Sequence, residues 1–370
     1  MLMNICVFCG ARPNFIKVAP VIRAMGNARR NGRDIDYQLV YAGPADDPTL
    51  EDNLFDDLRI SRPDEFLGVE CENLNELTGQ VMSQFEHYLQ QHATDVVIVV
   101  DDLASTMAAA IVTKKQGITL AHIAAGTRSF DITMPKEINR LVIDGLSDIL
   151  FTAGISNNSI ANREGAELSK VYMVGNILID NIRFNRERIL RPHWADELGL
   201  QEGAYYVFTL NRKALISDQD NLKQMLAALL ANAADTPVLA PLRGLARQTV
   251  EQCLAQLRDE GRLTTDNLLL HEPLSYLDFS YITAHARGVV TDSGNVAEEA
   301  TFNGVPCITL NSYTEHIETV KVGTNILVDG DAELLGKCIH QLQQGEWKHA
   351  AIPDRWDGRS AERIVQILLG

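Results

Sequence analysis

Short apolar runs recur along this chain, and the segments between them are long enough to hold a helix. In the first half the runs occupy residues 5–9, 37–41, 96–100, 119–123, 149–152 and 170–174. Two parallel strands need a crossover of about a dozen residues or more, usually a helix. The alternation therefore predicts βαβ units that build a parallel sheet.

The same pattern restarts after a polar segment at residues 185–202. Its apolar runs occupy residues 205–210, 237–240, 268–270, 288–291 and 307–310. With 370 residues, of which 46% are hydrophobic, the chain has the length and composition of two ordinary domains. We therefore predict the α/β class, with two Rossmann-like, doubly wound parallel sheets. A helix is expected between them at residues 176–190, and an amphipathic helix at about 360–369.

The composition argues against several functions. The net charge of -16 opposes contact with a phosphate backbone, so we expect no nucleic-acid partner. No apolar stretch approaches the ~20 residues of a membrane span, and the first residues lack the order of a signal peptide. These observations predict no membrane association and a cytoplasmic location.

The six cysteines include one CxxC pair, Cys6 and Cys9, inside the first apolar run. A zinc or redox site is one interpretation, but cysteines in a strand are usually small buried hydrophobes, and no second pair exists. The histidines show no ligand spacing. We expect no metal site and no cofactor.

In open parallel sheets, ligands bind beyond the carboxyl ends of the strands. The segment at residues 10–17, Gly-Ala-Arg-Pro-Asn-Phe-Ile-Lys, directly follows the first strand. Its glycine permits a tight turn and its proline suits the start of a helix. Arg12 and Lys17 would face an anion drawn to the helix N-terminus. The alternative is a solvated basic helix start.

Two more segments carry charged residues near strand ends. Asp101 and Asp102 follow the run at 96–100 and are either helix caps or a functional carboxylate, and the sequence favours capping. Glu137 and Arg140 lie three residues apart at the start of a predicted helix. The alternative to a functional pair is a surface ion pair worth a few tenths of a kcal/mol.

The strongest signal is the segment at residues 289–299, where a strand turns through Ser293 and Gly294 straight into a helix. Such a turn presents backbone amides and a hydroxyl to a phosphate. Glu299, about a turn and a half later, can reach a ribose diol. Simple capping of the helix is the alternative.

In this order, the segments resemble the non-hydrolysing UDP-N-acetylglucosamine 2-epimerase family over nearly the whole chain. The most specific matches lie at residues 128–135, 137–141, 174–176 and 291–299. The resemblance implies the GT-B architecture, with two Rossmann-like domains facing across a cleft, and a homodimer. The implied domains are residues 1–180, with a helix at about 355–370 packing back on them, and residues 181–354, which hold UDP.

The resemblance also implies a reaction, in which UDP is eliminated across C1 and C2 of the sugar and added back after the other face is protonated. Asp102 matches a catalytic aspartate and Arg140 an essential arginine, and Glu137 is the acid that remains beside them. A larger set is expected to bind the UDP-sugar: Arg12, Lys17, Asn211, Arg212, Ser293, Gly294 and Glu299.

Several positions depart from the family pattern where chemistry is expected. The acid of the His-x-Glu-Ala-Gly pattern is Ala124 here, and a second catalytic acid is Lys136. Asn211 stands where the family has a histidine, Leu242 replaces another, and His316 replaces an arginine. Losing an acid or base typically costs about 10²- to 10⁴-fold in rate. Ala124 removes a negative charge and Lys136 adds a positive one, and this local change would also suit a uronate nucleotide-sugar.

Three functions remain open at this point. The first is C2 epimerisation of a UDP-HexNAc, carried by Asp102, Glu137 and Arg140. The second is a catalytically impaired paralogue that binds a nucleotide-sugar in a regulatory or assembly role. The third is glycosyl transfer or hydrolysis on the same scaffold, because a fold does not determine a function.

Overall fold

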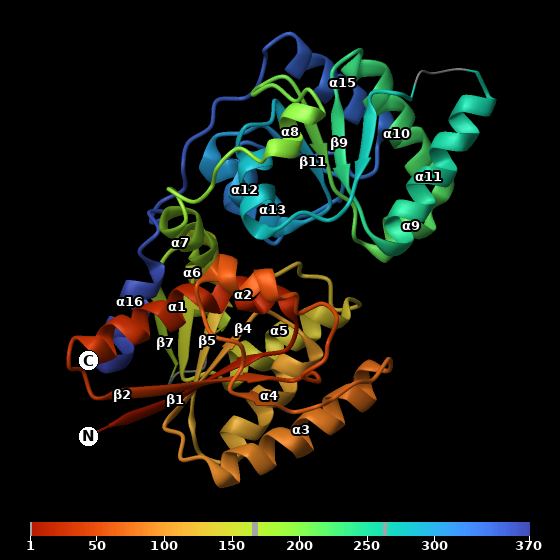
Figure 1. Cartoon of the computed structure of the whole chain (residues 1–370). Coiled ribbons are helices and arrows are strands. Elements are labelled where there is room, and N and C mark those ends of the chain that lie inside the picture. The colour runs from red at the N-terminus through yellow and green to blue at the C-terminus, as the bar shows by residue number, and fades with distance from the viewer. Residues whose placement is uncertain (1, 165–168, 262–264) are drawn as a thin grey trace. The chain divides into compact units, whose positions relative to one another are not determined.

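A computed structural model of the chain describes residues 2–164, 169–261 and 265–370 (Figure 1). The chain divides into two compact units. Unit 1 consists of the residues up to Phe184 together with Asp354–Gly370, and unit 2 of Asn185–Pro353. Each unit contains one parallel sheet with helices packed on it, which confirms the predicted α/β class.

The sheet of unit 1 has seven strands in the order β3-β2-β1-β4-β5-β6-β7. Every registered pair in it is parallel. Central strands of such sheets are buried on both faces, so they are rich in branched apolar residues, as in Val96–Val100. The strands are β1 (Met3–Cys9), β2 (Ile35–Tyr41), β3 (Glu65–Phe66), β4 (Val96–Val100), β5 (Thr119–Ala125), β6 (Ile149–Thr152) and β7 (Lys170–Met173).

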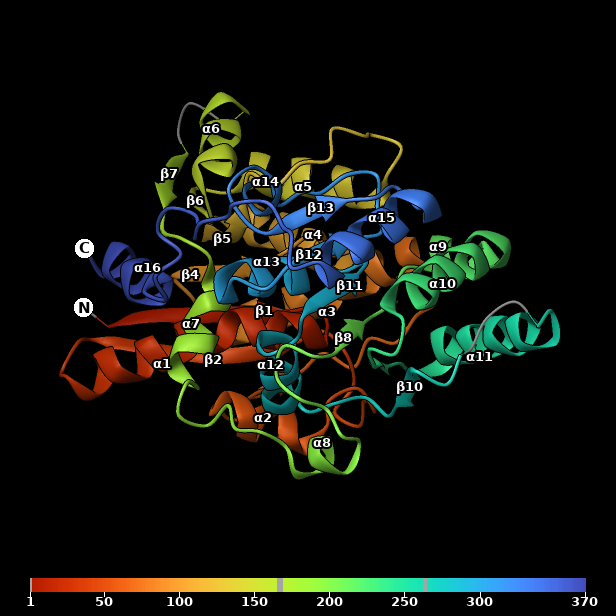
Figure 2. The ribbon, with the colours of Figure 1, turned by 90° about the horizontal axis from the view of Figure 1, so that it is seen from above.

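The helices of unit 1 form two groups. One group, α1, α7 and α16, packs together, and α3, α4 and α5 form a row of neighbours (Figures 1 and 2). The last helix of the chain thus packs on the first. The helices are α1 (Arg12–Arg30), α2 (Asp52–Leu58), α3 (Leu74–Gln91), α4 (Ala104–Lys115), α5 (Pro135–Leu146), α6 (Ile155–Glu164), α7 (Ile177–Phe184) and α16 (Ser360–Leu369).

The sheet of unit 2 has six strands in the order β10-β9-β8-β11-β12-β13, again parallel. Tyr206 and Phe208 of β8 pack into one hydrophobic core, while Tyr205 and Val207 pack into another. The alternation places one core on each face of the sheet. The strands are β8 (Tyr206–Phe208), β9 (Val238–Pro241), β10 (Leu268–His271), β11 (Gly288–Thr291), β12 (Cys307–Thr309) and β13 (Asn325–Leu327).

The helices of unit 2 also gather in two groups. Helix α10 packs against α9, α11 and α15, and α13 packs against α12 and α14. The helices are α8 (His193–Glu197), α9 (Lys213–Ser217), α10 (Gln219–Ala233), α11 (Gly244–Asp259), α12 (Tyr276–Ala284), α13 (Gly294–Asn303), α14 (Ile317–Lys321) and α15 (Ala332–Gln343). Among the described residues, no helix combines the length and the apolarity needed to cross a bilayer.

The structure corrects two details of the predicted elements. The helix expected at 176–190 ends at Phe184, because the backbone turns at Asn185, whose carbonyl accepts from the amides of Arg188 and Ile189. Strands β3 and β13 were not predicted, since β3 has only two residues and the apolar run at β13 spans only residues 326–328. Cys6 and Cys9 are buried in β1, and burial raises the pKa of both thiols.

Candidate functional site

The strand orders predict where a ligand binds in each unit. In a doubly wound sheet the crevice opens where neighbouring strands lead to opposite faces, beyond their carboxyl ends. In unit 1 that switch point lies between β1 and β4, and in unit 2 between β8 and β11. The predicted binding and catalytic residues follow these four strands, or lie on helices next to them.

Asp102 follows β4 in unit 1 and lies between two cations. Its Oδ2 accepts from Arg140 at two nitrogens, Nε at 2.7 Å and Nη2 at 2.6 Å, and its Oδ1 lies 3.4 Å from Lys136 Nζ. Burial disfavours the charged carboxylate, but Lys136 and Arg140 outweigh it and hold the pKa of Asp102 below its ordinary value. Asp102 is therefore an anion at neutral pH, available as a proton acceptor.

Asp101 adopts a left-handed backbone, with φ 62°, and its side chain points to α1. Its carboxylate accepts from Lys17 Nζ at 2.5 Å and from Asn14 Nδ2 at 3.0 Å. Lys17 is 6% exposed and forms this ion pair inside the unit. The ammonium group of Lys17 is therefore paired with Asp101 in the interior of the unit, and its predicted binding role stays a prediction.

The turn after β1 is close-packed. A Cβ at Gly10 would lie 2.1 Å from Ser105 Oγ, so a larger residue there requires the Ser105 side chain to move. Asn14 Oδ1 accepts from the amides of Gly10 and Ala11, at 2.9 and 3.2 Å, and so closes the start of α1. Arg12, at the first position of α1, is one-fifth exposed at its side chain and lies 3.5 Å from Glu51.

Glu137 belongs to the first turn of α5 and is 2% exposed. Its oxygens accept from the amides of Ser129 and Phe130, from Ser129 Oγ, and from Arg140 Nη1, all at 2.9 to 3.0 Å. Burial opposes its charge, but these donors hold the pKa of Glu137 below its ordinary value. The Glu137–Arg140 pair is thus a buried anchor for the loop before α5, not a surface ion pair.

In unit 2, Asp292 joins the ends of β8 and β11. Its Oδ2 accepts from the amides of Asn211 and Arg212 at 2.7 and 2.6 Å, and its carbonyl accepts from Arg212 Nε at 3.1 Å. The other carboxylate oxygen, Oδ1, is buried and has no hydrogen-bond partner among the described residues. Buried oxygens rarely stay unpaired, so a ligand or water donor is expected there.

Ser293 and Gly294 form the turn from β11 into α13. Ser293 is the N-cap residue, but its side chain accepts no capping hydrogen bond, which leaves the capping interpretation unsupported. The ring of His316 lies over Gly294, where a Cβ would be 2.6 Å from it. His316 Nδ1 is 2.8 Å from Glu298 Oε1. A helix N-terminus beside a histidine suits an anion.

The structure separates the predicted residues into two sets. Unit 1 holds Arg12, Lys17, Asp102, Glu137 and Arg140, and unit 2 holds Asn211, Arg212, Ser293, Gly294 and Glu299. Within unit 2, Glu299 lies on α13 and is 7% exposed.

One interpretation of the sequence was wrong. The aspartates at 101 and 102 do not cap α4, whose N-cap is Leu103 without a side-chain hydrogen bond. Their carboxylates instead bind side chains of α1 and α5, contacts that join segments far apart in sequence. His122, Asp292 and the contact of His316 with Glu298 were not predicted either. Two non-glycine residues with positive φ were not predicted either: Asp101, directly after β4, and Ala124, near the end of β5.

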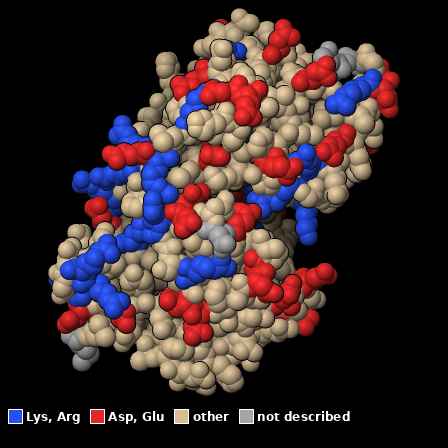
Figure 3. Space-filling model, viewed as in Figure 1, with Lys and Arg blue, Asp and Glu red and all other residues tan. Residues whose placement is uncertain are grey.

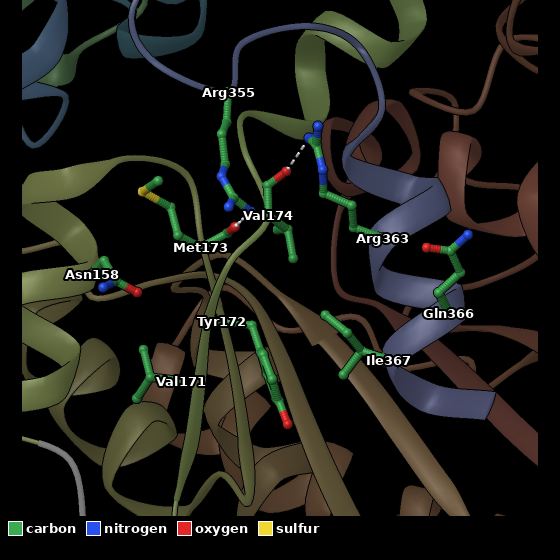
Figure 4. Close-up of a pocket in the computed structure, with 9 residues that line it drawn as sticks. All are labelled: Asn158, Val171, Tyr172, Met173, Val174, Arg355, Arg363, Gln366 and Ile367. Carbon is green, nitrogen blue, oxygen red and sulfur yellow. Dashed lines mark hydrogen bonds between the residues drawn. The ribbon is translucent and has the colours of Figure 1, made fainter. Parts of the chain in front are cut away.

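A pocket of about 380 Å³ lies elsewhere in unit 1, between β7 and α16 (Figure 4). Arg355 Nη1 donates to the carbonyl of Met173 at 2.7 Å, and Arg363 Nη1 to that of Val174 at 2.8 Å. Because β7 is an edge strand, these arginines cover carbonyls that could pair with another chain. No predicted site residue lines this pocket, so we do not assign the functional site to it.

The two parallel sheets with charged clusters at their switch points define an α/β protein of the GT-B type. The family model for UDP-N-acetylglucosamine 2-epimerase matches residues 27–369. The UDP-N-acetylglucosamine 2-epimerase of Methanocaldococcus jannaschii is 30% identical, over 99% of both chains. Its crystal structure in complex with UDP-GlcNAc and UDP is similar with a TM-score of 0.84, again over 99% of both chains.

A second relative is the UDP-2,3-diacetamido-2,3-dideoxy-D-glucuronate 2-epimerase of Pseudomonas aeruginosa, 31% identical over 90% of both chains. The chain therefore belongs to the UDP-N-acetylglucosamine 2-epimerase family, as its motifs predicted.

Proposed function

We propose that this protein binds a UDP-N-acetylhexosamine and epimerises it at C2, converting UDP-GlcNAc to UDP-ManNAc. The observation that carries the proposal is the ionised Asp102, held by Arg140 and Lys136 at the switch point of unit 1. Family membership supports it, because the relative from M. jannaschii is a UDP-N-acetylglucosamine 2-epimerase.

Each group has a role in the proposed reaction. Asp102 takes the proton from C2, while the C1–O bond breaks and its electron pair leaves with UDP, which gives a 2-acetamidoglucal. Reprotonation from the opposite face and return of UDP to C1 complete the inversion. Arg140 orients Asp102, and Glu137 holds the loop in front of it. Arg212 and the Ser293–Gly294 turn bind the diphosphate, and Glu299 the ribose.

Product formation tests the catalytic part. The protein is incubated with UDP-GlcNAc, and proton NMR follows the anomeric signals of UDP-GlcNAc and UDP-ManNAc. We expect both sugars to approach a constant ratio from either starting compound. Free UDP with a released sugar would instead indicate hydrolysis, and an unchanged substrate at high protein concentration would rule out epimerisation.

A second candidate function is nucleotide-sugar binding without turnover. It is favoured by the residues at three positions where the family has acids or a histidine, namely Ala124, Lys136 and Asn211. The unit 2 turn is retained, so this function still predicts calorimetric binding of UDP and UDP-GlcNAc. Binding without product would select this candidate, and no binding of either compound would reject both.

The substrate range is open to a uronate nucleotide-sugar. Lys136 is 59% exposed at its side chain and carries its ammonium to within 3.4 Å of Asp102. The P. aeruginosa relative is named for a glucuronate substrate. If Lys136 binds a sugar carboxylate, Lys136→Gln lowers the affinity for UDP-N-acetylglucosaminuronate and spares that for UDP-GlcNAc. Equal effects on both ligands would exclude this role.

We also propose that the protein works in the cytoplasm as a homodimer. All six cysteines are free, which suits a reducing compartment. The dimer rests on the family resemblance. Light scattering of the purified protein tests it, and a monomer at micromolar concentration would contradict it.

A further inference from the structure

A buried polar network lies under the carboxyl edge of the unit 1 sheet, with His122 of β5 at its centre. His122 Nδ1 is 2.6 Å from Asp144 Oδ1, and His122 Nε2 is 3.0 Å from the carbonyl oxygen of Asp101. His122 is 2% exposed and Asp144 5%. The ring therefore connects α5 to the turn that follows β4.

Both partners of the His122 ring are hydrogen-bond acceptors. A backbone carbonyl carries no proton to donate. Asp144 also accepts from Arg128 Nη1 at 2.7 Å and from the Gly126 amide at 3.0 Å, as a carboxylate does, and its pKa lies below the ordinary value despite the cost of burial. A ring that donates to both acceptors needs two N–H groups, which only the doubly protonated imidazolium has.

The surrounding charges balance this cation. Asp144 faces it from α5 and also binds Arg128 Nη1 at 2.7 Å, while Arg128 Nε binds Glu164 of α6 at 2.8 Å. On the other side, the Asp101 carboxylate is paired with Lys17 of α1. Two cations, His122 and Arg128, thus alternate with two anions, Asp144 and Glu164.

The contact of His122 Nε2 with the carbonyl oxygen of Asp101 restrains the backbone of Asp101. A non-glycine residue at φ 62° is in a sparsely populated region and stays there only when its surroundings hold it. His122 holds the carbonyl of Asp101, and Lys17 and Asn14 hold its side chain. The next residue is Asp102, so the orientation of the Asp101 peptide sets the direction of the Asp102 carboxylate toward Arg140.

We propose that His122 is a positioning residue, a buried imidazolium that locks the left-handed Asp101 peptide and so fixes Asp102 for proton transfer. The part that concerns proton transfer rests on the proposed function. The protonation of His122 and the locking of Asp101 do not.

The protonation is tested by NMR on protein labelled with ¹⁵N-histidine. The signals that are missing from the spectrum of His122→Gln identify the His122 ring. In the wild type, a long-range ¹H–¹⁵N correlation at pH 7 is expected to show that both nitrogens of this ring are protonated. A ring with one protonated and one bare nitrogen would overturn the proposal, whether or not the protein is an epimerase.

Two variants separate the two bonds of the ring. In His122→Gln, the side-chain amide nitrogen takes the place of Nε2 and still donates to the Asp101 carbonyl. In His122→Asn, the side-chain amide nitrogen takes the place of Nδ1 and donates only to Asp144. Thermal stability is expected to fall in both. Hydrogen exchange of the peptide that spans residues 100–103 is expected to accelerate more in His122→Asn.

The kinetic expectation follows from the same difference. His122→Asn lowers kcat for C2 exchange by about 10²-fold with KM nearly unchanged, because a small misplacement of a catalytic group is costly. His122→Gln retains activity within about tenfold. Equal backbone exchange in the two variants would overturn the positioning role. Inactive wild-type protein would refute the proposed function alone, since the NMR and exchange results still decide the role of His122.

Discussion

At the residue scale, the chemistry proposed here depends on a single carboxylate with a controlled charge. Asp102 is mostly buried, and burial alone would favour its neutral form. Arg140 and Lys136 reverse that preference through contacts of 2.6 to 3.4 Å. A carboxylate that remains ionised well below neutral pH is in its proton-accepting form over a wide pH range.

Arg140→Gln tests this control of charge. Losing the guanidinium raises the pKa of Asp102, because burial is then opposed by Lys136 but no longer by Arg140. A base works only when deprotonated, so the acidic limb of the pH profile of kcat moves to higher pH. The profile of C2 exchange measures the shift. Arg140→Lys, which keeps the charge but not the two-nitrogen contact, should lower kcat with a smaller displacement of the limb.

Asp102 could be predicted from the sequence, because it follows a predicted strand and matches a catalytic aspartate of the family. The side chains around it could not. Arg140, which binds Asp102, lies almost forty residues later, and Lys17 and Asn14, which bind the neighbouring Asp101, come from a helix more than eighty residues earlier. Such partners depend on the strand order, which no single segment encodes. For the same reason His122 was not predicted as a site residue, since its two partners lie on different elements.

At the scale of elements, the strand-to-helix turns are the part that the sequence predicts best. A run of branched apolar residues followed by a small polar turn occurs after β1 and β11, and both turns were found where expected. Strand β3 has only two residues, and the apolar run at β13 spans only residues 326–328, shorter than the runs at β8 and β12 that were predicted. Helix α7 ended early because its boundary depends on the turn at Asn185.

Gly294→Ala tests the turn into α13. The new Cβ would lie 2.6 Å from the ring of His316, which is tied to Glu298, so the ring or the turn must move. We expect the affinity for UDP to fall at least tenfold, or about 1.4 kcal/mol. Calorimetry measures it. Gly79→Ala is the matched control, because a Cβ there meets nothing within 4 Å and the residue lies inside α3. Equal affinities in the two variants would remove the turn from the site.

Helix α16 offers a test of how the end of the chain is held. Asp180 of α7 accepts from the amides of Ser360 and Ala361 at 3.1 and 2.8 Å, and burial raises the pKa of Asp180 to about 6. The folded state therefore binds a proton that the unfolded chain has already lost above about pH 4. Its contribution to stability is present at low pH and declines as pH rises toward 6.

Hydrogen exchange of the α16 peptide measures this dependence. In the wild type, protection corrected for the intrinsic rate should fall by up to about 20-fold between pH 4.5 and 7, or ~2 kcal/mol. Asp180→Asn, which cannot ionise, should show a flatter dependence. An identical dependence in both proteins would mean that other groups dominate the pH response of α16.

At the scale of the whole molecule, charge is distributed unevenly. The chain carries a net charge of -16, yet Lys and Arg side chains gather over α1 and α16 in one view of the surface (Figure 3). An anionic ligand is therefore attracted by local groups and not by the overall field. The predicted residues also fall into two units: the proposed base lies in unit 1 with Arg12 and Lys17, and the other predicted UDP-sugar contacts lie in unit 2.

This division predicts that a single substitution can remove UDP binding or the proton transfer without removing the other. Arg212→Ala should weaken UDP and UDP-GlcNAc by similar factors, because Arg212 is proposed to contact the part that both share. Asp102→Asn should leave UDP binding unchanged. Calorimetry with both ligands on both variants tests the division. A large loss of UDP affinity in Asp102→Asn would place Asp102 in the nucleotide site instead.

The most direct test of the central claim is the incorporation of deuterium at C2 of UDP-GlcNAc in deuterated water, followed by proton NMR. The wild type is compared with Asp102→Asn and with Asp235→Asn, a change at an exposed aspartate outside the predicted sites. We predict exchange by the wild type and by Asp235→Asn, and a loss of about 10²- to 10⁴-fold in Asp102→Asn. Equal exchange in all three proteins, or none in the wild type, would contradict the account.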